Sequence, residues 1–140
     1  MKVTIKRVNE AVHFEGESAS TDVKIHIDGS PEIGGEALGA RPMELVLMAL
    51  GSCSALDFIN ILKKQKQEIV DVKIDIDGKR KDTIPAVFTD VHLLFKLKGK
   101  IDAEKANKAA ELAVKKYCSV HDMLAAGGVQ ITYEVVIDAV

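Results

Sequence analysis

The chain of 140 residues contains no tryptophan, and its aromatic residues amount to only 4% of the sequence. Proteins that bind single-stranded nucleic acids stack the bases on exposed aromatic rings, so this composition disfavours such a partner. Basic clusters are missing too, because 19 Lys and Arg residues are interspersed with 21 Asp and Glu, giving a formal net charge of -2. With no basic patch to neutralise phosphates, we expect no nucleic acid partner.

The sequence also lacks the apolar N-terminal run of a signal peptide. Its most apolar stretch, residues 45–62, is nearly long enough to span a bilayer, but it is interrupted by polar or small residues: Gly51, Ser52, Ser54, Asp57 and Asn60. This pattern favours a buried helix over a membrane span. We therefore expect a cytoplasmic protein with no membrane partner, whose thiols meet a reducing environment where a permanent disulfide is disfavoured.

Hydrophobic residues make up 47% of the chain and charged residues 29%, which is typical of a globular domain. Alternation of apolar and polar residues predicts strands over 2–8, 11–15, 22–27, 69–81, 86–98 and 129–138. Helical spacing predicts helices over 43–66, from the N-cap Asp102 to about Tyr117, and over 120–126, and a long loop over 29–42. The order predicts a single α+β domain over 1–140, with antiparallel sheets packed on a central buried helix.

The chain has only two cysteines, 65 positions apart. Cys53 lies in the middle of the most apolar helix, where a buried thiol with a raised pKa is the simplest interpretation. Cys118 ends an amphipathic helix and precedes Ser119, which we interpret as the N-cap of the next helix. A helix N-terminus favours a thiolate, and His121 could act as a local base, so Cys118 is either a core residue or a reactive thiol. The spacing neither supports nor excludes a contact between the two cysteines.

Other motifs are weaker. The four histidines show no paired ligand spacing, and Cys118-x-x-His121 is only half of a zinc site, so we expect no metal. The glycines Gly34, Gly35 and Gly39 precede no Lys-Ser or Lys-Thr pair, so they do not form a phosphate loop. No Gly-x-Ser-x-Gly elbow is present either. We expect no cofactor.

Two segments resemble the OsmC/Ohr family of osmotically inducible proteins and organic hydroperoxide resistance proteins, most closely its OsmC-related branch. They are Arg-Pro-Met-Glu-Leu-Val-Leu-Met-Ala-Leu-Gly-Ser-Cys-Ser-Ala-Leu-Asp over 41–57 and Lys-Lys-Tyr-Cys-Ser-Val-His over 115–121. The resemblance implies an intertwined homodimer that reduces organic hydroperoxides in oxidative-stress defence. It implies that Cys53 attacks the peroxide, that Cys118 resolves the resulting sulfenic acid to a disulfide, and that an external dithiol restores both thiols.

Two positions depart from the family pattern. Active members carry a Glu directly after the helix-leading Pro, whereas here Met43 holds that place and the carboxylate is Glu44. They also use an Arg from the N-terminal hairpin, but no Arg occurs between Val8 and Ala40. Glu44, Arg41 and His121 are therefore the candidates for tuning the thiols. The alternative hypothesis is a non-enzymatic dimer of the same fold that binds a small apolar molecule or a partner.

Overall fold

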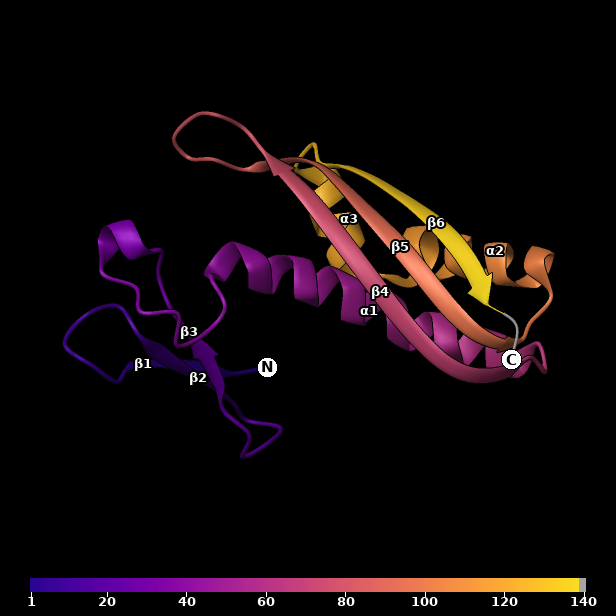
Figure 1. The fold of residues 1–140 in the computed structure, drawn as a ribbon, viewed down its shortest axis with the longest axis horizontal. Helices are drawn as coiled ribbons and strands as arrows, with labels where there is room; N and C mark the ends of the chain where they lie inside the picture. The colour runs from indigo at the N-terminus through magenta and orange to yellow at the C-terminus, as the bar shows by residue number, and fades with distance from the viewer. Residues whose placement is uncertain (139–140) are drawn as a thin grey trace. The chain divides into compact units, whose positions relative to one another are not determined.

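The computed structural model describes residues 1–138, which form two compact units, Met1–Val46 and the part of Leu47–Val140 up to residue 138. The boundary falls within helix α1 (Pro42–Lys64), and each unit is described by itself. Helices and strands follow one another as expected for the α+β class (Figure 1). The single domain expected over 1–140 stays a prediction.

The first unit contains a three-stranded antiparallel sheet in the order β1-β2-β3. Its strands are β1 (Val3–Arg7), β2 (Phe14–Ser18) and β3 (Ile25–Ile27). The strand expected over 11–15 begins three residues later, because Asn9 extends the turn. The Asn9 side-chain oxygen accepts hydrogen bonds from the backbone N–H groups of Ala11 and His13, at 3.0 and 3.1 Å. Such Asx contacts compete with strand pairing.

A buried carboxylate organises the long loop that follows β3. Asp28 is only 2% exposed, and its oxygens accept hydrogen bonds from the backbone N–H groups of Gly29, Glu36 and Leu38, at 2.8, 2.9 and 3.1 Å. The bonds from Glu36 and Leu38 are the main reason that the pKa of this carboxyl is lowered. The loop, which includes the short helix η1 (Pro31–Ile33), therefore has a defined conformation.

The second unit is built on a three-stranded sheet in the order β4-β5-β6. Its elements after α1 are β4 (Glu68–Arg80), β5 (Phe88–Lys100), α2 (Ala103–Glu111), the π-helical segment η2 (Leu112–Tyr117), α3 (Ser119–Ala126) and β6 (Gln130–Asp138). The expected antiparallel pairing holds for β4 and β5, whereas β6 runs parallel to β5, so the sheet is mixed. The helices between β5 and β6 form the crossover that a parallel pair requires.

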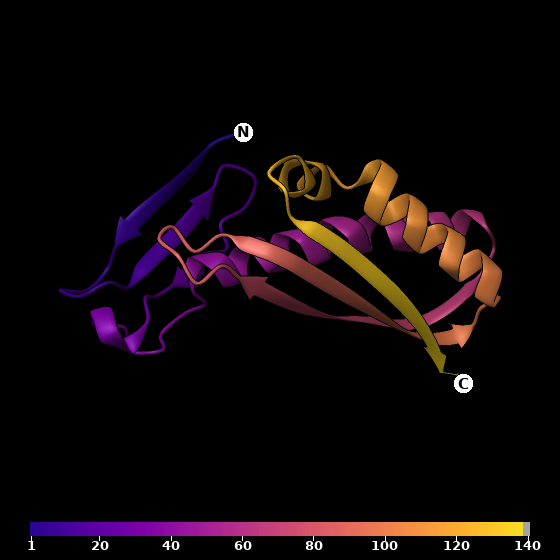
Figure 2. The ribbon, with the colours of Figure 1, turned by 90° about the horizontal axis from the view of Figure 1, so that it is seen from above.

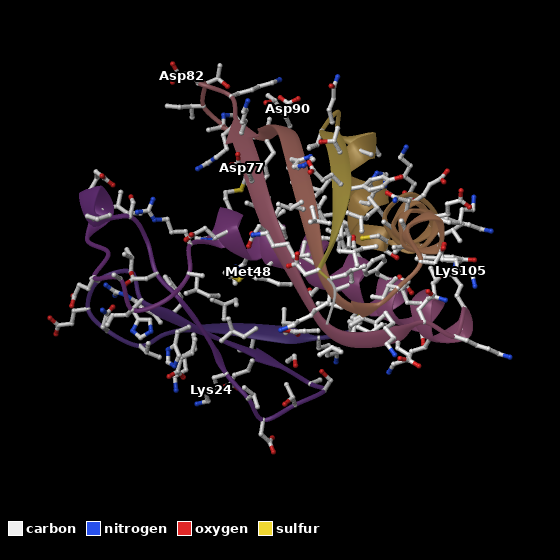
Figure 3. The ribbon with its side chains drawn as sticks, turned by 45° about the vertical axis from the view of Figure 1, so that its right-hand side comes forward. Lys24, Met48, Asp77, Asp82, Asp90 and Lys105 are labelled. Carbon is white, nitrogen blue, oxygen red and sulfur yellow. The ribbon has the colours of Figure 1, made fainter. Side chains whose placement is uncertain are left out.

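The helices lie on one face of this sheet (Figure 2). That face is apolar, as its buried residues Val91, Leu93 and Phe95 show. Ile74, Phe95 and Val135 are paired across the three strands on that face. The ring of Phe95 meets that of Phe58 from α1 with the ring centroids 4.7 Å apart. The opposite face is polar and contains ion pairs such as Lys96 with Asp75. Asp77 and Asp90 lie at one end of the β4–β5 hairpin (Figure 3). The alternation predicted from the sequence therefore separates core from solvent.

Helix α1 was expected to be a central buried helix, but its burial is confined to one stripe. The buried residues are Leu50, Gly51, Ser54, Phe58 and Leu62. Met48 and Leu56 are 54% and 73% exposed. The helix is long and apolar enough to cross a membrane, but the core helix of a soluble protein can be equally long and apolar. Its sheet-facing stripe packs as a core helix does.

Candidate thiol site

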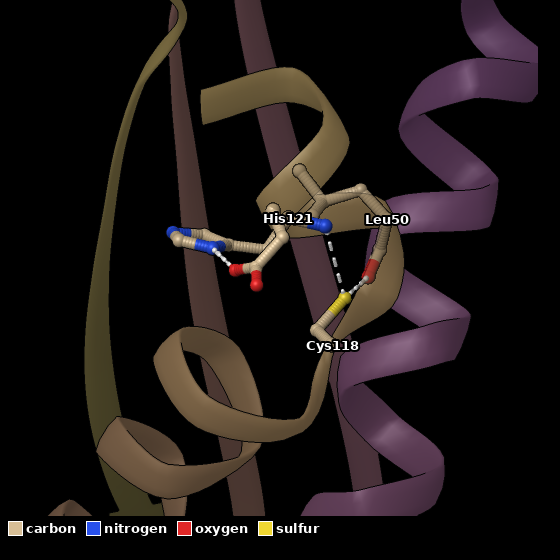
Figure 4. Close-up of polar contacts among 4 residues, drawn as sticks. Leu50, Cys118 and His121 are labelled. Carbon is tan, nitrogen blue, oxygen red and sulfur yellow. Dashed lines mark hydrogen bonds and ion pairs between the residues drawn. The ribbon is translucent and has the colours of Figure 1, made fainter. Parts of the chain in front are cut away.

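Cys118 lies at the junction between η2 and α3, where the backbone leaves the helical conformation, with φ of -76° and ψ of 106°. Its Sγ accepts a hydrogen bond from the backbone N–H of His121 at 3.3 Å (Figure 4). This places the sulfur at the N-cap of α3, where a side-chain acceptor satisfies a free N–H group of the first turn. The N-cap predicted at Ser119 is therefore wrong by one residue, since Ser119 is already helical.

The Cys118 side chain is packed against α1. The residue is 1% exposed, and its thiol lies 3.9 Å from the backbone carbonyl oxygen of Leu50, to which it is a weak donor (Figure 4). The next turn of the same helix carries Cys53 and Ser54. Because Leu50 and Cys118 belong to the second unit, this contact defines one local site between α1 and the η2–α3 junction.

The structure brings the two cysteines together. Cys53 is half-buried, and it lies close enough to Cys118 to shift the pKa of the Cys118 thiol. Burial is the main cause that raises the pKa of the Cys118 thiol, and the hydrogen bond and negative charge of Cys53 raise it further. The Ser54 hydroxyl and the His121 N–H act in the opposite direction and lower it. A negative charge on Cys53 would therefore disfavour ionisation of Cys118 beside it.

Ser54 is the site residue that sequence reasoning missed. It is fully buried, and its Oγ has no hydrogen-bond partner within residues 1–138. Ser52, two positions earlier, is exposed and donates to the carbonyl oxygen of Met48 at 2.7 Å. The two serines differ in which side of α1 they occupy: Ser54 lies on the buried stripe with Leu50 and Phe58, and Ser52 does not.

Arg41 and Glu44 belong to the first unit, and the contacts that the structure gives them lie within it. The Glu44 carboxylate accepts a hydrogen bond from the backbone N–H of Arg41 at 2.9 Å, and the Arg41 carbonyl accepts one from Leu45 at 3.0 Å. Arg41 is thus the N-cap of α1, with Glu44 three residues later reaching back as in a capping box. The cap gives Glu44 a structural role. The role of Arg41 and Glu44 in tuning the thiols stays a prediction.

His121 contacts Cys118 through its backbone rather than its ring. Its Nδ1 lies 3.1 Å from the Asp122 carboxylate, and Figure 4 shows the imidazole pointing away from the sulfur. This geometry does not support the expectation that His121 serves as the local base. Residues 1–138 include no group of three His, Cys, Asp or Glu side chains arranged to hold a metal ion.

An open hollow of about 310 Å³ lies on the other side of α1, against β4, and has a mostly apolar lining of Met48, Gly51, Ser52, Ala55, Ile59, Val72, Ile74 and Ile76. A second hollow, of about 340 Å³, is lined by Asp57, Asn60, Ile61, Lys64, Gln65, Leu112 and Tyr117. Asp57 follows Cys53 by one helical turn, and Tyr117 directly precedes Cys118. The second hollow therefore adjoins the segments that carry both thiols.

The model of the family described as OsmC-like protein matches residues 34–134, which include both cysteines. The chain belongs to the OsmC-like family. Protein YhfA of Escherichia coli strain K12 is 41% identical over 139 residues, which cover 97% of this chain and 98% of YhfA. The resemblance drawn from the two cysteine segments is thus confirmed.

Solved structures agree with the OsmC-like assignment. The crystal structure of a hypothetical protein from Aquifex aeolicus VF5 is 32% identical, with a TM-score of 0.80 over 98% of this chain and 96% of that one. The organic hydroperoxide resistance protein OhrB of Bacillus subtilis shares the fold, with a TM-score of 0.67 and 21% identity over 96% of each chain. The OsmC-like fold class is therefore confirmed, and OsmC/Ohr proteins are cysteine-based and cofactor-free.

Proposed function

We propose that this protein is a thiol-dependent peroxidase that reduces organic hydroperoxides through Cys53 and Cys118, in defence against oxidative stress. The observation that carries the proposal is that the Cys118 sulfur packs 3.9 Å from the Leu50 carbonyl oxygen of α1, one turn before Cys53, which is close enough to raise the pKa of Cys118. A sulfenic acid formed beside a second thiol is converted to a disulfide before it can be oxidised further. Membership of the OsmC-like family supports the same class of activity.

In the proposed reaction, the Cys53 thiolate attacks the terminal oxygen of the hydroperoxide. The O–O bond breaks, the alkoxide leaves as an alcohol after taking a proton, and Cys53 becomes a sulfenic acid. The Cys118 sulfur then attacks the Cys53 sulfur, the S–O bond breaks, and the hydroxyl group leaves as water with the Cys118 proton. An external dithiol reduces the resulting disulfide by thiol–disulfide exchange and becomes a disulfide itself.

The burial of the two residues fits this division of roles. Cys53 is the more exposed of the pair, so an incoming peroxide reaches it first, whereas Cys118 is 1% exposed. The hollow lined by Asp57 and Tyr117 lies beside the segments that hold both sulfurs. A negative charge on Cys53 opposes ionisation of Cys118, and this opposition is lost once Cys53 has been oxidised.

The proposal includes a cytoplasmic homodimer. Met48 and Leu56 are exposed apolar residues on α1 that the second unit leaves uncovered, and the hollow between α1 and β4 is also mostly apolar. A second copy of the chain would cover such surfaces. A reducing cytoplasm would supply the dithiol that restores the thiols.

The decisive experiment follows the consumption of cumene hydroperoxide with dihydrolipoamide as the reductant. We expect turnover by the wild type and none by Cys53→Ser. Ser52→Ala is the matched control, since its hydroxyl lies on the same helix but bonds to Met48 instead of facing Cys118. Equal rates for the wild type and Cys53→Ser would disprove the peroxidase.

A second candidate function is a non-enzymatic OsmC-like dimer that binds a small apolar molecule. The hollow of about 310 Å³ between α1 and β4 favours it, and so does the absence of a cation among the groups within residues 1–138 that shift the pKa of Cys118. Native mass spectrometry of the purified protein tests this alternative. A co-purified apolar ligand together with no hydroperoxide turnover would support it, and turnover without a ligand would contradict it.

A further inference from the structure

The Ser54 hydroxyl is a buried polar group without a structural partner. The residue is fully buried, and within the described part of the chain its Oγ makes no hydrogen bond. A serine in a helix commonly bonds back to the carbonyl one turn earlier, as Ser52 does with Met48. Ser54 makes no such bond, and an unsatisfied buried hydroxyl is unfavourable for folding. Its presence therefore calls for an explanation other than stability.

The sulfur of Cys118 lies beside the turn that ends at Ser54. The Cys118 thiol is 3.9 Å from the Leu50 carbonyl oxygen, which in an α-helix also accepts the backbone N–H of Ser54. The buried stripe of α1 that contains Leu50 also contains Ser54. The Ser54 hydroxyl is thus placed on the side of α1 that Cys118 covers, one residue after Cys53.

We propose that Ser54 is a positioning residue for the resolving step, whose hydroxyl donates a hydrogen bond to the Cys118 sulfur as it becomes a thiolate and attacks Cys53. The inference rests on the proposed function and adds a residue to it. In the resting site the Cys118 thiol is protonated and a poor acceptor, so the hydroxyl makes no well-formed bond. A thiolate is a strong acceptor, and the donor is then already in place.

The groups around Cys118 support this assignment. Burial is the largest influence and raises the pKa of its thiol, while Ser54 is the largest of the influences that lower it. The His121 N–H contributes from α3, and its ring is bonded to Asp122 instead. Cys53, on α1, opposes ionisation when it carries a charge, but a sulfenic or disulfide sulfur at that position does not. Ser54 therefore acts most strongly once Cys53 has reacted.

The test uses an aryl disulfide, dithiobis-nitrobenzoate, in place of a peroxide. The Cys53 thiolate displaces one thionitrobenzoate and forms a mixed disulfide, and Cys118 then displaces the second in an intramolecular step. Because the chain has only two cysteines, the second release reports the attack by Cys118 alone. The Cys118→Ser variant should release one thionitrobenzoate per chain and defines the first phase.

We expect Ser54→Ala to slow the second release about tenfold at pH 7 and to move the midpoint of its pH profile upward, leaving the first release unchanged. Ser54→Thr, which keeps the hydroxyl, should restore a midpoint near that of the wild type, and Ser52→Ala should behave as the wild type. The assignment is overturned if the second release is equally fast in Ser54→Ala and in the wild type. It is also overturned if the wild type shows no second release, or if Ser54→Thr behaves like Ser54→Ala.

This assay needs no peroxide turnover, so it separates the two proposals. A Ser54-dependent second phase without hydroperoxide consumption would refute the peroxidase but retain the role of Ser54 toward Cys118. Hydroperoxide consumption with an unchanged second phase in Ser54→Ala would refute the role of Ser54 alone.

Discussion

Gly51 of α1 packs directly against Ile76 of β4, so closely that a Cβ at position 51 would collide with the Cδ1 atom of Ile76. Helix α1 can therefore approach the sheet at this point only because the residue before Ser52 and Cys53 has no side chain. Gly51 and Ile76 also line the hollow between α1 and β4.

We predict that Gly51→Ala destabilises the protein by about 1 kcal/mol, because the clash outweighs the gain in helix propensity. In an Ile76→Val background, which lacks the Cδ1 atom, the same substitution should be stabilising by about 1 kcal/mol. Urea unfolding of the four proteins of this double-mutant cycle measures both effects. If Gly51→Ala changed the free energy of unfolding in the same direction in both backgrounds, the Cδ1 atom of Ile76 would not be the cause.

We predict that Cys118→Ser traps the oxidised form of Cys53. Without a neighbouring thiol the sulfenic acid cannot form the disulfide, so excess hydroperoxide should carry it on to sulfinic acid. Intact-mass spectrometry after treatment with cumene hydroperoxide should show an addition of two oxygens in this variant and the loss of two hydrogens in the wild type. Recovery of an unmodified Cys118→Ser chain would contradict the assigned order of attack.

We predict that Ser54→Ala stabilises the folded protein by about 1 kcal/mol, since it removes a buried hydroxyl that has no partner. The same variant is expected to slow the resolving step, so stability and reactivity should change in opposite directions. Urea unfolding of reduced protein measures the stability, with Ser52→Ala as the control. A loss of stability in Ser54→Ala would indicate that the hydroxyl has a structural partner after all.

We predict that Asp28 makes the loop of the first unit acid-sensitive. The pKa of its carboxyl lies below the ordinary value of 3.8, so the carboxylate stabilises the fold above that pH and loses its effect as the pH falls through the lowered value. Amide exchange at Glu36 and Leu38, which donate to this carboxylate, should accelerate in that acidic range.

Asp28→Asn should accelerate the same exchange at neutral pH and remove its acid dependence, because the amide offers one oxygen in place of two. Asp22→Asn, an exposed carboxylate in the same unit, is the matched control. If amide exchange at Glu36 and Leu38 still accelerated in acid in Asp28→Asn, another carboxylate would have to be responsible.

We predict that Glu44→Ala lowers the free energy of unfolding by about 1 kcal/mol, which is typical for the loss of a helix cap. Glu44→Gln should be close to the wild type, because its amide oxygen can still accept the hydrogen bond from the Arg41 N–H. If Glu44 only caps α1, hydroperoxide turnover by Glu44→Gln should also be retained. A Gln variant that is stable but inactive would instead assign the carboxylate to the thiol chemistry.

Local patterns in the sequence predicted most elements of the fold. Alternation located β4 and β5 within about two residues, and Asp102 was identified as the N-cap of α2, where it accepts the Lys105 N–H at 2.9 Å. The parallel pairing of β6 could not be read in this way, because alternation is the same for either strand direction. It depends on the crossover through α2, η2 and α3.

The site shows the same limit. Cysteine spacing was uninformative, and the closeness of Cys53 to Cys118 could be anticipated only from the family resemblance. The cap at Cys118 was missed because serine is a commoner N-cap than cysteine, and Ser119 directly follows Cys118. The role of Ser54 could not be predicted from the sequence, because it depends on which face of α1 is buried and on where the Cys118 side chain lies against that face.

The atom that caps α3 is also the atom proposed to form the disulfide. If the sulfur turns toward Cys53 to form the disulfide, it moves away from the His121 N–H that it caps, so each oxidation would loosen the first turn of α3 and each reduction would tighten it again. The order of the first turn of α3 would thus depend on the redox state of the two cysteines, so a partner that recognises this helix end could distinguish the oxidised from the reduced protein.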